Sequence, residues 1–152
     1  HGISSYGELE SKLTAVSARR DTAHAEIKRI ESRSAELTLV MKHAGTYRQL
    51  KPIYDRYRKS NDKEKFLRGH ESEIILFEAA ARELKRLGAV PLPTTESMKT
   101  ELTNLAAEKE RLLAGYKAAR TEAQEYETVK QNVDALLTVP KEQEQQRRHE
   151  LE

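Results

Sequence analysis

A stretch in the middle of the chain, residues 47–70, combines cationic side chains with tyrosines. It holds eight lysines and arginines against three carboxylates, a net charge of +5, whereas the whole chain of 152 residues has a formal net charge of +2. Cations bind phosphates through Coulomb attraction and counterion release, and tyrosine rings stack on unpaired bases. The segment therefore predicts contact with the phosphate backbone of a nucleic acid. The cations expected to make it are Arg48, Lys51, Arg56, Arg58, Lys59, Lys63, Lys65 and Arg68.

The tyrosines of this segment have a second interpretation. Tyr54 and Tyr57 are three residues apart, so on a helix they share one face. With Tyr47 they are also suited to a small core where two helices pack, which would leave the cations facing water or neighbouring glutamates. Packing by the rings and phosphate contact by the cations are compatible, and both interpretations stay open.

The sequence offers little for catalysis. Its five histidines lie in unrelated segments, without the i, i+4 spacing of a helical metal site. His70 beside Glu71 and Glu73 forms the nearest polar cluster, and packing or hydrogen bonding is the more common role for such a histidine. There is no glycine-rich phosphate loop, and the absence of cysteine excludes disulfides and thiolate ligands. We expect no catalytic residue, no metal site and no cofactor in this chain.

Two heptad tracts flank the basic segment and predict the elements that position it. Apolar residues recur in alternating steps of four and three from Tyr6 to Ala44 and from Met98 to Leu137. This period predicts two long helices, over about 5–44 and 95–138, each with one stripe that must be buried against a partner. Their similar lengths favour antiparallel pairing, within one chain or across a homodimer.

Breaker residues divide the region between the tracts. Gly45 is expected to end the first long helix, and a shorter helix is predicted over about 46–59, with Pro52 at its first turn or at a kink. A turn at 60–62 then leads to a helix over about 62–87, which Gly88 ends. The apolar run 74–77 is expected to be buried on more than one side.

The fold class predicted is all-α, an elongated antiparallel helical bundle or coiled coil. Apolar residues are 37% and charged residues 34% of the chain, proportions that favour a thin helical structure over a thick core. We expect one helical domain over 5–138, a vector remnant or linker at 1–4, and a tail with a vector-derived end at 139–152, where Pro140 stops the last helix. No apolar run is long enough for a membrane span, and a cytoplasmic location without membrane contact is predicted.

Beyond these patterns, the chain resembles the helical C-terminal region of relaxases, the mobilisation nucleases of conjugative and mobilisable elements in Gram-positive-type bacteria. The resemblance covers about residues 10–138 and depends on order and spacing. Its residues are Tyr47-Arg48, Ile53-Tyr54, Tyr57-Arg58, Phe66, His70-Glu71-Ser72-Glu73-Ile74, Ala79-Ala80-Ala81, Leu92-Pro93, Leu102, Leu105, Glu108-Lys109, Leu112, Tyr116, Arg120, Asn132-Val133-Asp134 and Leu136-Leu137. The sequence departs from the family pattern at Pro52, where an unbroken helix is expected, and at Gln49-Leu50, which replace a more basic stretch.

The resemblance implies a role without implying an activity for this chain. Relaxases nick DNA with an N-terminal domain that carries a histidine triad, a divalent metal and a nucleophilic tyrosine, and nothing here matches that triad. No catalytic residue is carried over. The resemblance implies a non-catalytic part of a DNA-nicking enzyme that holds DNA or recruits relaxosome and coupling proteins. The alternative is a structural coiled coil, for oligomerisation or as an adaptor, that binds no nucleic acid.

Overall fold

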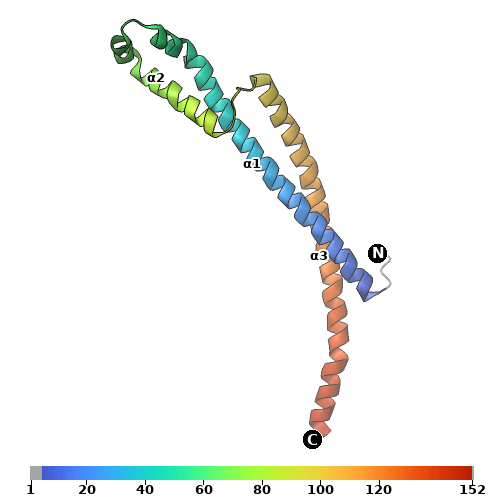
Figure 1. Ribbon diagram of the computed structural model, residues 1–152. Helices are drawn as coiled ribbons and strands as arrows, with labels where there is room; N and C mark the ends of the chain where they lie inside the picture. Colours follow the sequence, from blue (N-terminus) through green and yellow to red (C-terminus); the bar gives the residue numbers. More distant parts are fainter. Residues whose placement is uncertain (1–4, 152) are drawn as a thin grey trace. The chain divides into compact units, whose positions relative to one another are not determined.

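The computed structural model describes the backbone of residues 5–151 and the side chains of residues 5–137. Within these residues the chain forms three helices and no strand: α1 (Tyr6–Lys59), α2 (Lys63–Arg86) and α3 (Thr95–Leu151) (Figure 1). The all-α prediction is confirmed. The prediction of two long and two short helices is wrong, because the segments 5–44 and 46–59 belong to one helix. The remnant predicted at 1–4 lies outside the described residues.

Two breaker residues fail to interrupt α1. Gly45 follows the fully buried Ala44 and has no left-handed backbone; the positive-φ glycine among the described residues is Gly88. Pro52 lies inside α1, where its missing N–H leaves the carbonyl of Arg48 without its helical donor. The local cost of each residue is a few kcal/mol at most, since Gly costs about 1 and Pro about 3 kcal/mol relative to Ala. Ala44 is buried before these positions and Tyr54 and Tyr57 are half-buried after them, and this packing outweighs the cost.

Pro140 likewise does not stop α3, whose backbone continues to Leu151. The prediction that the helix ends near 138 is therefore wrong. A proline removes one helical hydrogen bond, whereas the segment that follows it is rich in Lys, Glu, Gln and Arg. These residues are strong helix formers, so the helix resumes after a single defect.

Helix α2 begins and ends where the sequence predicts. Asp62 caps its N-terminus by accepting a hydrogen bond of 3.1 Å from the backbone N–H of Lys65. At the C-terminus Gly88 has φ +70° and donates to Lys85, while Ala89 donates to the carbonyl of Leu84. This pair of bonds is the Schellman arrangement, which favours glycine in the left-handed position.

Thr94 caps the N-terminus of α3, where its hydroxyl oxygen accepts a hydrogen bond of 3.1 Å from the backbone N–H of Ser97. No helix among the described residues is both long enough and apolar enough to cross a membrane.

The chain divides into two compact units, each of which has its own core. The first consists of His1–Lys28 with Lys109–Glu152, and the second of Arg29–Glu108. The described part of the first unit pairs the start of α1 with α3. Its core cluster is Leu9, Val16, Ala119, Ala123 and Tyr126, with Leu13 packed against it.

Polar contacts along the first unit establish that the two helices are antiparallel. The hydroxyl of Tyr6 donates a hydrogen bond of 2.9 Å to Asp134, and Arg19 pairs with Glu122 at 3.1 Å. Residues early in α1 thus meet residues late in the paired part of α3. The antiparallel pairing predicted from the heptads is present here within one chain.

The second unit packs all three helices together. In this unit α2 turns back along the last part of α1, as Figure 1 shows. Arg33 on α1 holds Glu101 on α3 through two hydrogen bonds, of 2.8 and 3.2 Å. The buried residues are Ile30, Leu37, Val40 and Ala44 of α1, Ile74, Phe77, Ala80 and Leu84 of α2, and Met98 and Leu105 of α3.

One burial prediction for α2 is wrong. Ile74 and Phe77 are buried, but Ile75 and Leu76 are 54% and 55% exposed. Helix α2 packs along a single stripe, and these two residues lie on its other side. An apolar run of four residues is longer than one helical stripe requires, so burial of the whole turn needs a second covering element.

Candidate nucleic-acid interface

A ladder of aromatic rings joins α1 and α2 in the second unit. Phe77 of α2 stacks on Tyr47 at 4.7 Å and on Tyr54 at 4.3 Å between ring centroids. The ladder continues to the turn through Tyr54–Tyr57 at 6.0 Å and Tyr57–Phe66 at 6.2 Å. Such ring pairs add about 0.5–1.5 kcal/mol each beyond the area they bury. The interpretation of the tyrosines as a packing core is confirmed.

His70 extends the same ladder. Its ring lies 4.5 Å from that of Phe66, and its backbone (φ −135°, ψ 26°) departs from helical values, which marks a kink in α2. Its Nδ1 lies 3.6 Å from the Glu73 carboxylate, too far for a good hydrogen bond, and has no hydrogen-bond partner among the described residues. Of the two roles expected for His70, packing or hydrogen bonding, its ring shows packing. The kink itself was not predicted.

The turn between the two helices is fixed by short-range hydrogen bonds. The backbone N–H of Ser60 donates to the carbonyl of Tyr57 at 3.2 Å. The hydroxyl of Ser60 accepts from the backbone N–H of Asp62, also at 3.2 Å. With the Asp62 cap, these bonds hold the cations on either side of the turn on a defined backbone.

The eight cations predicted to bind phosphate are all exposed, but three of them have partners inside the unit. Arg48 donates to the hydroxyl of Thr95 at 2.9 Å and to the carbonyl of Pro93 at 2.6 Å. Lys51 pairs with Asp55 at 3.0 Å, and this hydrogen bond raises the pKa of Lys51. The guanidinium of Arg56 lies over the ring of Phe66, 5.7 Å from its centroid. Arg48 and Arg56 thus have contacts that sequence spacing did not reveal, whereas the Lys51–Asp55 pair has the i, i+4 spacing of a helical ion pair.

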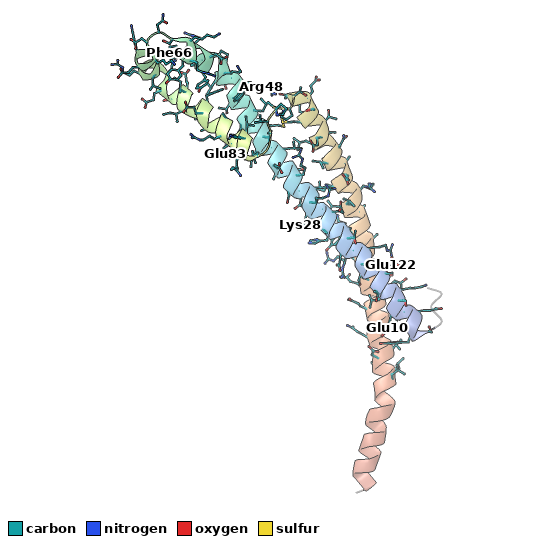
Figure 2. The ribbon with its side chains drawn as sticks, viewed as in Figure 1. Glu10, Lys28, Arg48, Phe66, Glu83 and Glu122 are labelled. Atoms are coloured by element: carbon teal, nitrogen blue, oxygen red, sulfur yellow. The ribbon has the colours of Figure 1, made fainter. Side chains whose placement is uncertain are left out.

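The other five cations gather at the turn and are called here the basic tip. Within the part of the chain that the structure describes, no ion pair involves any of them. Between positions 58 and 68 only Asp62 and Glu64 oppose them, and Asp62 is engaged as a cap. Figure 2 labels Phe66 beside this turn. The basic tip consists of Arg58, Lys59, Lys63, Lys65 and Arg68.

The basic tip has the electrostatics of a site for an extended polyanion. Exposed lysine and arginine side chains that lack internal partners can replace the counterions of a phosphate backbone. Among the residues with described side chains, no group of three or more His, Asp or Glu could hold a metal ion. The arrangement has the charge and exposure to bind phosphates.

No protein-family model, curated protein or solved structure matches this chain.

Proposed function

We propose that the chain is a non-catalytic helical module of a DNA relaxase and that its basic tip contacts the phosphate backbone of DNA. The observation that carries the DNA contact is the set of five exposed cations of the basic tip, which have no ion pair among the described residues. The assignment to a relaxase depends on the sequence resemblance alone. Relaxosome and coupling proteins are further proposed partners of the module.

Charge at one place, and not total charge, is what the proposal requires. The chain as a whole is nearly neutral, so a nonspecific attraction between protein and DNA is weak. A hairpin turn with five cations concentrates the field at one end of a helical pair. Binding should therefore depend on these five residues far more than on the same number of cations elsewhere.

The test compares two variants with the same change in charge. One replaces the five cations of the basic tip with glutamine, and DNA affinity is measured by fluorescence anisotropy. The matched control replaces five exposed cations of other segments with glutamine: Lys12, Lys99, Arg111, Lys117 and Arg120. The proposal predicts that only the basic-tip variant loses binding. Equal losses in both variants, or no binding by the unmodified chain, would refute it.

The second candidate function is self-association or an adaptor role. It is favoured by apolar residues that stay uncovered: Leu136 and Leu137 on α3 are 73% and 60% exposed, and Ile75 and Leu76 lie exposed on α2. Light scattering over a range of concentrations separates the two functions. A tight dimer without measurable DNA affinity would favour the structural role.

A further inference from the structure

We infer that the basic tip takes double-stranded DNA, which it contacts through phosphates alone, without stacking on bases. This inference rests on the proposed function and specifies its substrate. It follows from the aromatic ladder, because rings that pack against one another are less available to stack on bases.

Proteins that prefer single strands combine a basic groove with aromatic rings on which bases stack, worth about 1–3 kcal/mol per base. The segment 47–70 has the composition for this, with Tyr47, Tyr54, Tyr57 and Phe66 among its cations. In the structure, however, each of these rings already has a ring partner on α1 or α2. Base stacking would compete with these ring contacts, three of which join α1 to α2.

Among these rings, Phe66 is the one most open to a base. It lines a shallow hollow of about 260 Å³ beside the turn, together with Ser60, Lys65 and Gly69. Yet Phe66 also contacts Tyr57 and His70 and lies under the guanidinium of Arg56. A base entering the hollow would compete with three existing contacts of this ring, so we assign Phe66 to the packing of the turn.

Without base stacking, the preference between duplex and single-stranded DNA depends on the density of phosphate charge. A DNA duplex carries one phosphate charge per about 1.7 Å of axis, a denser line of charge than a single strand offers. The cations of the basic tip come from both helices of the hairpin, with Arg58 and Lys59 at the end of α1 and the other three at the start of α2. The phosphates of a duplex are held in rigid rows, which suit cations on a fixed turn. A single strand is flexible and must be ordered on binding, which costs free energy.

The inference predicts how strongly the DNA affinity depends on salt concentration. If all five cations contact phosphates, log K against log salt has a slope of about −4.5 for duplex and about −3.5 for single strand. The duplex slope corresponds to an affinity loss of about 500-fold between about 50 and 200 mM salt.

The experiment titrates the unmodified chain with a short DNA duplex and with each of its separated strands, at several salt concentrations. Tighter duplex binding with a slope near −4.5, unchanged by scrambling the sequence, is the expected result. A single strand bound as tightly as the duplex or more tightly, or a strong dependence on sequence, would overturn the inference while leaving the proposed DNA contact in place. Failure to bind either form contradicts the proposed function itself.

A pair of variants tests the role of the rings directly. Phe66→Leu and Tyr57→Leu keep apolar packing but remove the ring faces, and circular dichroism establishes whether the helices persist. Unchanged affinity for both DNA forms is expected from each folded variant. A selective loss of single-strand binding in either would show that the ring stacks on bases.

Discussion

The guanidinium of Arg48 on α1 donates a hydrogen bond of 2.6 Å to the carbonyl oxygen of Pro93, in the connector that leads into α3. A second hydrogen bond, of 2.9 Å, goes to the hydroxyl of Thr95 at the start of α3. Arg48 therefore ties the connector to α1 within the second unit. In the sequence Arg48 is one of eight cations of the segment 47–70, whereas in the structure it holds the connector in place.

Replacing Arg48 with alanine should affect stability more than DNA binding. Loss of hydrogen bonds from this exposed side chain is expected to lower the free energy of unfolding by about 1 kcal/mol. Urea unfolding measures the effect, with Arg111→Ala as an exposed control in α3. An Arg48→Ala variant with unaltered stability and a DNA affinity as poor as that of the basic-tip variant would contradict this role.

Phe77 should be the most sensitive position of the aromatic ladder. It is 5% exposed and stacks on both Tyr47 and Tyr54, so Phe77→Ala is expected to cost about 3–4 kcal/mol of unfolding free energy. Ile75→Ala, on the exposed side of the same helix, should cost less than about 1 kcal/mol. Similar losses from the two substitutions, measured by chemical denaturation, would argue against a single packed stripe on α2.

Two glycine substitutions should have effects of opposite sign. Gly88 has φ +70°, so Gly88→Ala forces a side chain into the left-handed region and is expected to destabilise the chain by about 1 kcal/mol. Gly45 lies inside α1, and a Cβ added there meets no atom within 4 Å, so Gly45→Ala should stabilise by about 0.5–1 kcal/mol. Melting temperatures of the two variants test the pair. Stabilisation by Gly88→Ala would contradict the Schellman ending of α2.

Tyr6 gives the first unit a dependence on alkaline pH. Its hydrogen bond to Asp134 raises the pKa of Tyr6 from 10.0 to about 12. Because the folded state holds this proton more tightly than the unfolded state, the contribution of Tyr6 to stability is complete below pH 10.0 and disappears as the pH rises towards about 12.

Tyr6→Phe is the control for this prediction, since other groups also titrate in the same range. The difference in unfolding free energy between the unmodified chain and this variant should shrink over that interval. A difference that stays constant, or that grows with rising pH, would show that the phenol proton is not held by Asp134.

Periodicity predicted several of the residues that face inward but not where the two long helices end. Leu9, Val16 and Ile30 belong to the predicted stripe and are buried, because a heptad register is a property of the whole tract and tolerates local defects. The effect of Gly45 or Pro52 depends instead on a balance between a local backbone cost and the burial available on both sides. That burial depends on tertiary packing, which the local sequence does not show. The helix predicted over 5–44 is therefore shorter than α1.

The candidate site was predictable in charge but not in partners. The surplus of cations is visible in composition, and the exposure of Lys63 and Arg68 follows from a polar position beside a turn. The engagement of Arg48 depends on a connector 45 residues later in the chain, and that of Arg56 on a ring across the turn. Contacts between segments distant in sequence leave no local signal, which is why the sequence did not separate Arg48 and Arg56 from the other cations. The Lys51–Asp55 pair, by contrast, has an i, i+4 spacing that is visible in the sequence.

The central claim, that the basic tip meets DNA, is tested most directly by lysine footprinting. Acetylation of the folded chain is followed by mass spectrometry with and without a DNA duplex at low salt. We predict protection of Lys59, Lys63 and Lys65, with Lys12, Lys99 and Lys117 modified to the same extent in both samples. Protection spread evenly over all six lysines, or confined to Lys12, Lys99 and Lys117, would contradict the account.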